Sequence, residues 1–146
     1  MSDSPKPIAD GATFVSPRGP DPVGAYPHCR RVGNLLFISG IGPRRLGEKV
    51  IPGVTMNDKG EVVSYDIAEQ CRAVFHNLRV IIEDAGSRWE NIVDITSFLT
   101  NMERDFAGYN REYAAHVKHG PTRTTVEVNA LPTKINVELK VIATIG

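Results

Sequence analysis

Arg123 is the residue whose type and position best suit the binding of a small anion. It follows Gly120-Pro121-Thr122 at the start of a predicted strand, where side chains next to a tight turn project into pockets. An arginine there can bind a carboxylate with two parallel hydrogen bonds, because its guanidinium is a rigid fork. The residue alone leaves a second interpretation open, which is a solvent-exposed arginine or a surface ion pair.

Glu138 is the second candidate for chemistry. It lies on the polar side of a strand whose other side is wholly apolar. A carboxylate in that position must be paired, solvated or carry a raised pKa, and a raised pKa suits general acid or base work. The alternative is an exposed glutamate beside Lys140.

Three residues near the N-terminus have weaker signals. Tyr26 could donate a hydrogen bond to a ligand, or pack at a turn. Ser39 and Gly40 end a strand that is predicted to be buried, and glycine there allows a ligand to approach the backbone. A plain turn explains Gly40 equally well.

Other reactive side chains do not form a pattern that indicates a cofactor or metal. His116 and His119 are three residues apart, but two histidines without a carboxylate or thiolate partner are a weak metal signal. Cys71 falls on an apolar helix stripe and Cys29 has no neighbouring base, so neither is predicted to be a nucleophile. We expect no metal and no organic cofactor.

The elements that must position these residues follow from the periodicity. Residues 135 to 145 alternate apolar and polar side chains and predict a strand, as do residues 122 to 128 and 91 to 99. Two strand-like runs, 26 to 31 and 35 to 39, flank Gly33-Asn34 and predict a hairpin. Residues 43 to 60 combine glycines, prolines and basic side chains, and we expect a long basic loop there.

Two helices complete the predicted elements. Asp66-Ile67-Ala68-Glu69 has the spacing of a capping box, and Gly86 is a suitable C-terminal cap. Between them one apolar stripe recurs at steps of three and four, made by Ile67, Cys71, Val74, Leu78, Ile81, Ile82 and Ala85. Phe106, Tyr109, Tyr113 and Val117 predict a second amphipathic helix that ends at His119-Gly120-Pro121.

The order of these elements predicts an α+β fold, in which two helices cover one face of a mixed sheet. Six of the ten prolines lie in the first 27 residues, so residues 1–25 are predicted to be an irregular, extended N-terminal arm and residues 26–146 a single domain. The other face of the sheet carries polar groups and is available for a site.

Charge and composition restrict the function classes. Lys and Arg number 17, as do Asp and Glu, so the net charge is zero and a nucleic-acid partner is disfavoured. Low net charge favours self-association. With two cysteines, no secretory signal and no apolar run long enough to span a bilayer, we expect a cytoplasmic protein without a membrane partner.

Several motifs together resemble the RidA (YjgF-type) family of enamine/imine deaminases. They are Gly24-Ala25-Tyr26, the run Gly33 to Gly40, Asp84-Ala85-Gly86, and above all Pro121-Thr122-Arg123-Thr124-Thr125-Val126-Glu127-Val128 with Leu131-Pro132. The resemblance covers about residues 26 to 143. It implies a chorismate-mutase-like fold and a homotrimer whose three active sites lie in the clefts between subunits.

The resemblance also implies roles for single residues. Arg123 matches the arginine that binds the substrate carboxylate, and Glu138 matches the glutamate that positions the hydrolytic water. Tyr26, Ser39, Gly40 and Asn110 match positions that line the cleft of the family.

Departures from the family pattern point to a larger substrate. Ile41 and Thr125 replace the Gln and Cys that are usual in members acting on small enamines, and the loop after Gly40 is longer and basic. Within the family the chain is most similar to 2-aminomuconate deaminases, which convert the dicarboxylate 2-aminomuconate to 4-oxalocrotonate and ammonia in aromatic or tryptophan breakdown. The candidates to bind the second carboxylate are the cations Arg44, Arg45, Arg30 and His28.

Two alternatives remain open at this point. One is a general deaminase of small enamines such as 2-aminoacrylate or 2-aminocrotonate, the precursors of 2-iminopropanoate and 2-iminobutanoate. The other is a trimeric small-carboxylate binding module without catalysis, although the presence of both Arg123 and Glu138 weighs against it.

Overall fold

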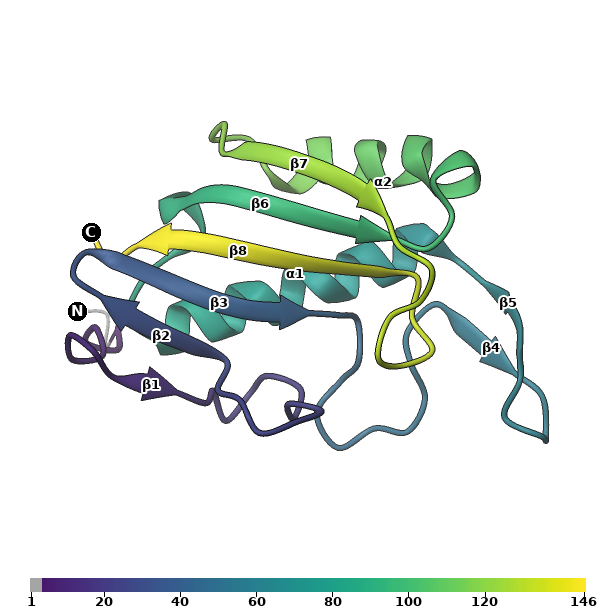
Figure 1. Cartoon of the computed structure of the whole chain (residues 1–146), viewed down its shortest axis with the longest axis horizontal. Helices are drawn as coiled ribbons and strands as arrows, with labels where there is room; N and C mark the ends of the chain where they lie inside the picture. Colours follow the sequence, from purple (N-terminus) through teal and green to yellow (C-terminus); the bar gives the residue numbers. More distant parts are fainter. Residues whose placement is uncertain (1–3) are drawn as a thin grey trace.

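A computed structural model of the chain describes residues 4–146. In that range the chain forms a main sheet of six strands, a small sheet of two strands and two α-helices (Figure 1). In chain order the elements are β1 Thr13–Phe14, β2 Cys29–Val32, β3 Leu35–Ile41, β4 Val54–Met56, β5 Val62–Tyr65, α1 Ile67–Asp84, a 3-10 turn Trp89–Asn91, β6 Ile92–Leu99, α2 Met102–His116, β7 Thr122–Glu127 and β8 Val137–Thr144.

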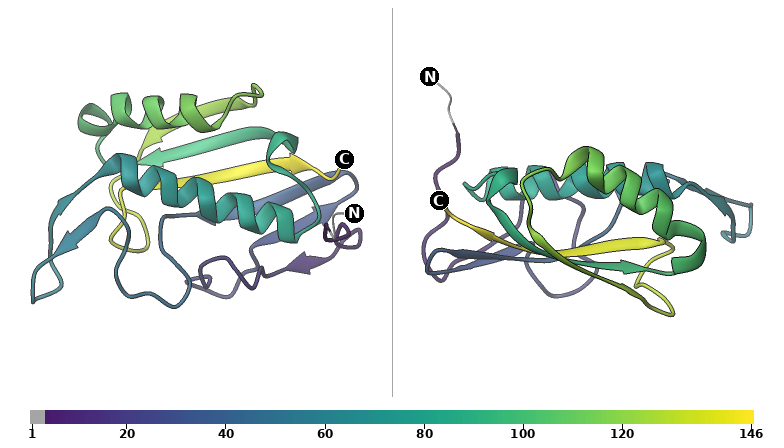
Figure 2. Two further views of the ribbon diagram at one scale, coloured as in Figure 1. Left: turned by 180° about the vertical axis from the view of Figure 1, so that it is seen from behind. Right: turned by 90° about the horizontal axis from the view of Figure 1, so that it is seen from above.

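The main sheet has the strand order β1-β2-β3-β8-β6-β7. Only the β6–β7 pair is parallel among these strands, since α2 carries the chain back between them. Both helices lie on the same side of the sheet (Figure 2). The predicted α+β fold with two helices on one face is therefore confirmed.

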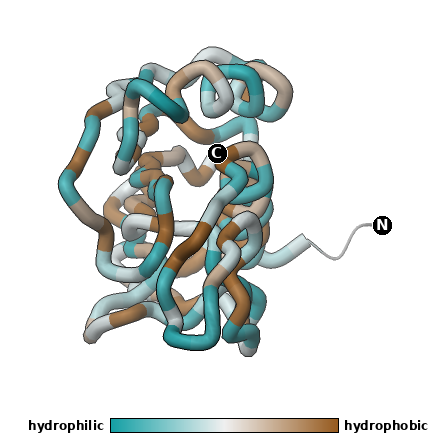
Figure 3. The backbone as a smooth tube through the Cα atoms, turned by 90° about the vertical axis from the view of Figure 1, so that its right-hand side faces the viewer, coloured by the Kyte–Doolittle hydropathy of each residue, from teal (hydrophilic) through white to brown (hydrophobic). Residues whose placement is uncertain are grey.

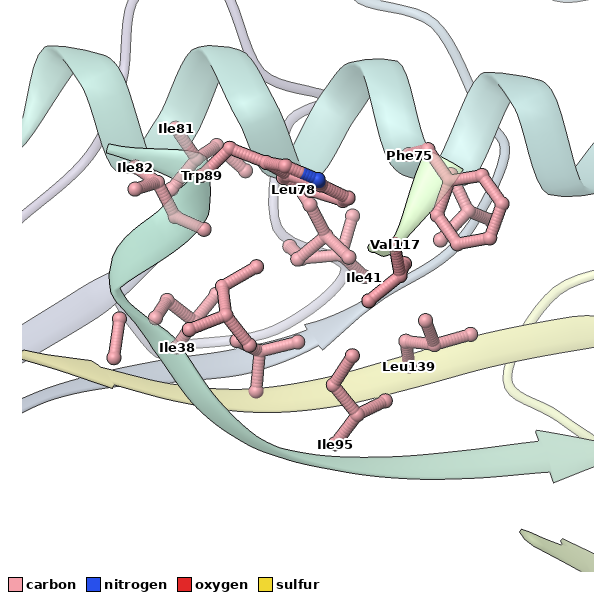
Figure 4. Packing of buried hydrophobic residues seen from close by; sticks show 14 of the residues in the cluster. Ile38, Ile41, Phe75, Leu78, Ile81, Ile82, Trp89, Ile95, Val117 and Leu139 are labelled. Atoms are coloured by element: carbon pink, nitrogen blue, oxygen red, sulfur yellow. The ribbon is translucent and has the colours of Figure 1, made fainter. Parts of the chain in front are cut away.

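The core lies between α1 and the sheet, as Figure 4 shows. The alternating residues of β8 and its neighbours that face the helices are buried, and we call this side the helix face; it carries Leu36, Ile38, Ile95, Leu99, Val137, Leu139 and Val141. The predicted stripe of α1 packs on it, with Val74, Leu78, Ile81 and Ile82 fully buried. No helix in residues 4–146 covers the opposite side, which we call the second face (Figure 2).

Helix α1 begins and ends where the sequence predicts. The Asp66 carboxylate accepts hydrogen bonds from the amides of Ala68 and Glu69 at 3.0 and 3.3 Å, and Gly86 adopts φ +87° just after the helix. The reciprocal half of the capping box is different. The Asp66 amide donates to the carbonyl of Gly53 at 2.7 Å, which ties the preceding loop to the helix start.

Two expectations for the irregular segments need correction. Residues 43–60 are not simply a basic loop, because they contain β4, which pairs with β5 in a hairpin that projects from the body (Figure 1). Ile51 and Val54 of this region form a second small core with Ile135. Figure 3, which looks at this end of the molecule, shows hydrophobic residues interspersed among the hydrophilic ones.

The N-terminal arm is also less irregular than expected. Thr13 and Phe14 form an edge strand paired with Arg30 and Cys29, because β2 offers free backbone groups there. The amide of Ile8 donates to Ala85 after α1 at 3.1 Å, so the described part of the arm is attached to the domain.

Both cysteines belong to the core, and burial raises the pKa of the Cys29 and Cys71 thiols to about 12. The thiols are therefore protonated at neutral pH. No helix among residues 4–146 is long and apolar enough to cross a membrane.

Candidate functional site

The site residues fall into two groups, and the first surrounds Arg123. Strand β7 pairs in parallel with β6 so that Arg123 lies opposite Ile95, on the helix face. Its Nη2 donates to Oδ1 of Asn110 on α2 at 2.8 Å. Three aromatic rings of α2 surround the guanidinium, with centroids 4.7 Å (Tyr113), 5.1 Å (Tyr109) and 5.9 Å (Phe106) from Cζ. We call this group the arginine cluster.

Helix α2 is held over Arg123 at its first turn. Its N-cap Asn101 accepts from the amide of Arg104 at 3.0 Å, and the Glu127 carboxylate at the end of β7 accepts from the amide of Met102 at 2.8 Å. These contacts fix the start of α2 relative to β7. The rings hold the cation by cation–π attraction and leave its remaining donors for a ligand.

The second group lines a pocket on another part of the chain, which we call the glutamate pocket. Three chain segments and β8 form its wall. The lining residues are Pro20 to Val23, Tyr26, His28, Gly40 to Gly42, Arg44, Pro132, Thr133, Ile135 and Glu138. Its volume is about 30 Å³, which holds about one water molecule. In one chain the pocket is therefore only part of the space that an organic substrate needs.

Glu138 is the carboxylate that the sheet contributes to this pocket. It lies opposite Phe98 on the second face of the sheet and is half-buried. Burial raises the pKa of Glu138 above its ordinary value, and the positive charge of Arg44 opposes that shift. A carboxylate whose pKa is raised holds a proton more readily than an ordinary glutamate, and it can orient a water molecule.

Any side chain at position 40 would displace the Glu138 carboxylate. A bulge after Ile38 shifts the register of β3, and a Cβ atom on Gly40 would lie 2.6 Å from Oε2 of Glu138. That distance is shorter than any real contact of a Cβ atom. The glycine therefore makes room for the carboxylate.

Tyr26 and Ser39 both lie near Glu138, but only the Tyr26 hydroxyl is free to donate a hydrogen bond to a ligand. Tyr26 lines the pocket, is 40% exposed, and its hydroxyl accepts from the amide of Val23 at 3.3 Å. Its own proton remains for a ligand. Ser39 lies beside the pocket lining, and its hydroxyl donates to the carbonyl of Pro27 at 2.8 Å, which fixes the chain next to Tyr26.

The structure separates the candidate cations for a second carboxylate. Arg44 lines the glutamate pocket and donates from Nη2 to the carbonyl of Asp21 at 2.6 Å. Arg45 points elsewhere, with Nη1 3.8 Å from Oε2 of Glu48 in a separate hollow. Arg30 is exposed on β2 and outside the pocket lining.

His28 lines the pocket, but its ring is engaged on both sides. Nδ1 accepts from the amide of Ser16 at 2.9 Å, and Nε2 lies 2.6 Å from the carbonyl of Pro20. This pairing requires a neutral ring with its proton on Nε2. Of the four cations considered from the sequence, only Arg44 is both charged and at the pocket.

The arginine cluster and the glutamate pocket are on opposite faces of the sheet. Arg123 shares a face with Ile95, which is buried under the helices, whereas Glu138 shares a face with Phe98 and Lys140. The structure thus brings Arg123 to Asn110, and Glu138 to Tyr26, Gly40 and Arg44, but does not join the two groups within one chain.

Sequence reasoning missed Asn77, and it noted Thr125 only as a departure from the family pattern. Asn77, buried in α1, donates both amide hydrogens to the loop that carries Arg44. Its signal is a polar residue that interrupts an apolar helix surface. Thr125 lies two residues after Arg123 on the same face, and among residues 4–146 its hydroxyl is the buried side-chain polar atom without a hydrogen-bond partner.

Metal ligands do not gather in the described range. Residues 4–146 contain no group of three or more His, Cys, Asp or Glu side chains placed to hold a metal ion. His116 and His119 instead place ring nitrogens 2.8 and 3.1 Å from the carbonyls of Glu112 and Ile92.

Comparisons with known proteins match most of the chain. The family model described as Endoribonuclease L-PSP matches residues 17–145. A RutC family protein of Pyrococcus abyssi is 33% identical over 127 residues, which are 86% of this chain and 91% of the relative. The mitochondrial protein MMF1 of Saccharomyces cerevisiae is 30% identical over 138 residues, 91% of this chain and 86% of the relative.

Solved structures share the fold over most of the chain. The YjgF gene product of E. coli has a TM-score of 0.77 at 29% identity, and E. coli TdcF with bound serine has 0.76 at 27% identity. Each comparison covers 91% of this chain and 98% of the other. The family match, the relatives and the shared fold all lead to one assignment: the chain belongs to the Endoribonuclease L-PSP family, that of the YjgF, RidA and RutC proteins.

Proposed function

We propose that the protein is an enamine/imine deaminase whose complete active site forms between subunits of a homotrimer. The observation that carries this is the separation of Arg123 and Glu138 on opposite faces of one sheet. A carboxylate receptor and a water-orienting base are useful only when both reach the same substrate. Contact between the arginine cluster of one subunit and the glutamate pocket of the next supplies that arrangement.

The second face of the sheet supports self-association. Strands β2, β3 and β7 expose apolar side chains on this face, with Val32 52%, Leu35 39% and Val126 37% exposed. The chain also has zero net charge, so repulsion between copies is weak. A second copy packed on this face would bury the apolar surface and enlarge the small glutamate pocket into a cleft.

The proposed reaction uses only side chains and water. Arg123 holds the carboxylate next to the reacting carbon, and protonation of the enamine at carbon gives the imine. Glu138 accepts a proton from a water molecule while the water oxygen adds to the C=N carbon. This addition forms a carbinolamine. Glu138 gives this proton to the nitrogen, the C–N bond breaks to release ammonia, and the hydroxyl proton leaves to solvent, where it replaces the proton added to carbon. The ketone remains, and Glu138 is ionised again.

For the substrate we propose 2-aminomuconate, a six-carbon dicarboxylate. Arg44 supports this choice, because it places a second cation in the same pocket as Glu138. The related TdcF was solved with bound serine, so a protein of this fold binds a small amino acid. Small enamines that carry one carboxylate are therefore the second candidate substrates.

Ammonia release tests the proposal. The protein is incubated with freshly generated 2-aminomuconate and, separately, with a dehydratase that produces 2-aminoacrylate or 2-aminocrotonate. We expect faster release from 2-aminomuconate, and a raised KM for it in Arg44→Met but not in Arg45→Met. Faster release from the small enamines would favour the general deaminase, and release from neither would favour a carboxylate-binding module. An RNA substrate in parallel checks the activity that the family description names.

A further inference from the structure

Three polar residues of α1 follow one another at intervals of seven: Gln70, Asn77 and Asp84. Seven residues make almost two turns, so the three residues lie on one side of the helix. Each is about 10 Å from the next along the helix axis. They are removed from solvent, with Gln70 0% and Asn77 3% exposed and the Asp84 side chain 14% exposed. We call them the polar file.

Each member of the polar file binds a different segment of the chain. Asn77 donates from Nδ2 to the carbonyls of Gly42 at 2.9 Å and Arg44 at 2.7 Å. Gln70 both donates to Oδ1 of Asn136 and accepts from its amide, each at 2.9 Å.

Asp84 binds the N-terminal segment. One carboxylate oxygen accepts from the Ser16 hydroxyl at 2.6 Å, and the other accepts from Nη2 of Arg18 at 2.7 Å. None of the residues bound by Gln70, Asn77 or Asp84 belongs to a strand of the main sheet. All three members of the file therefore hold segments that lie outside the main sheet.

The three segments held in this way are the ones that wall the glutamate pocket. Residues 20–23 follow Arg18, residues 40–44 contain the carbonyls bound by Asn77, and residues 132–135 precede Asn136. Arg44 also joins two of them, because its Nη2 donates to the carbonyl of Asp21. The pocket wall thus depends on one helix side that never touches the pocket itself.

We propose that the polar file positions the pocket wall, and that Asn77 sets substrate selectivity by holding Arg44 in place. Asn77 uses both amide hydrogens on the backbone of the segment from which the Arg44 side chain extends. Without these donors two carbonyls lose their partners and the segment moves to find others. The selectivity part of this inference rests on the proposed function, whereas the positioning part does not.

Hydrogen exchange of the backbone amides tests the positioning. Asn77→Ala is expected to speed exchange in residues 41–46 only, Gln70→Ala in residues 133–137 only, and Asp84→Asn in residues 15–20 only. Asn34→Ala, an exposed asparagine at the β2–β3 turn, is the matched control and changes none of them. Faster exchange throughout the chain, or none beyond the control, overturns the proposal.

Kinetics test the selectivity. Asn77→Ala is expected to raise KM for 2-aminomuconate about tenfold with kcat little changed, while KM for a monocarboxylate enamine stays constant. Arg44→Met added to Asn77→Ala has little further effect, because both act through one guanidinium. Asn77→Ser keeps one donor, remains folded more readily and gives an intermediate KM.

The outcomes separate the two proposals. If the wild type deaminates neither substrate, the proposed function fails, and the exchange pattern alone decides the positioning. If the wild type is active but the Asn77 variants raise KM for both substrates equally, or for neither, Asn77 is only a structural residue and the selectivity inference is wrong.

Discussion

The guanidinium of Arg123 is held by three aromatic rings and one amide, so its position is set before a ligand arrives. Lysine cannot reproduce the two parallel hydrogen bonds, and we expect Arg123→Lys to be strongly impaired. Arg123→Ala is expected to lose about 10²–10³ in kcat/KM, because binding and orientation fail together. Steady-state kinetics of ammonia release check this, with Arg111→Ala, an exposed arginine of α2, as the control.

In the proposed reaction, Glu138 contributes to turnover more than to binding. Glu138→Gln keeps the shape of the side chain but removes the proton acceptor, so we expect ligand binding within a few-fold of wild type and loss of most turnover. Calorimetry with an unreactive dicarboxylate and kinetics on the same preparation measure the two effects. Unchanged turnover would show that Glu138 is a structural residue.

Arg44 also affects the pH dependence of the reaction. Burial raises the pKa of Glu138 and Arg44 lowers it, so removal of the Arg44 charge raises the pKa further. The base works when ionised, and in Arg44→Met the acidic limb of the pH profile of kcat/KM is therefore expected to move to higher pH. Arg45→Met should leave the limb in place, since Arg45 faces Glu48 instead. A limb that moves to lower pH would contradict this assignment.

At the scale of elements, Asp84 adds to the attachment of the N-terminal arm, beside the β1–β2 pairing and the Ile8 amide. Burial alone would raise the pKa of Asp84, but the hydrogen bonds from Arg18 and Ser16 outweigh it and hold the pKa below its ordinary value. The resulting stability is present above the ordinary pKa near 3.8 and is lost as pH falls through the folded-state value.

Asp84→Asn is therefore expected to lower the free energy of unfolding at pH 7 by about 1 kcal/mol, a modest value because Arg18 is half exposed. The difference from wild type shrinks below about pH 4, where the wild type loses the same contribution. Urea denaturation at pH 7 and pH 3 measures both, and Asp58→Asn on the exposed hairpin is the control. An equal deficit at both pH values would show that the charge does not contribute.

The elements that the sequence predicts well are those with a long, regular pattern. The stripe of α1 and the alternation of β8 repeat often enough to identify both elements and the buried side of each. Thr13 and Phe14 are too short a run among prolines to indicate a strand, and β4 is hidden among glycines and charges.

The candidate site residues can be named from the sequence, but their arrangement cannot. The family motif identifies Arg123 and Glu138, yet their placement on opposite faces follows from the parallel β6–β7 register, which no local pattern reveals. Asn77 was missed because its role depends on a loop that lies more than thirty residues earlier in the chain.

At the scale of the whole molecule, a complementation test can decide whether the active site forms between subunits, as we propose. Subunits with Arg123→Ala and subunits with Glu138→Gln are each expected to be nearly inactive alone. After unfolding and refolding together in equal amounts, trimers with random composition would regain about a quarter of wild-type activity, because some interfaces combine an intact Arg123 with an intact Glu138. Assay of the mixture before and after refolding measures the gain. No gain in a mixture that sediments as trimers would place each site within one chain.

The loop after Gly40 is anchored at both ends, and its middle can therefore accept inserted residues. Asn77 holds residues 42–44, and the Asp66 amide holds Gly53, so the loop is gripped at both ends, while residues 45–50 between them are exposed. Loop closure costs little more as a loop lengthens, and anchored ends keep the added residues from pulling on the pocket. Residues 45–50 are therefore the best position for an inserted segment or a grafted peptide tag, because the added residues extend into solvent and leave the glutamate pocket unchanged.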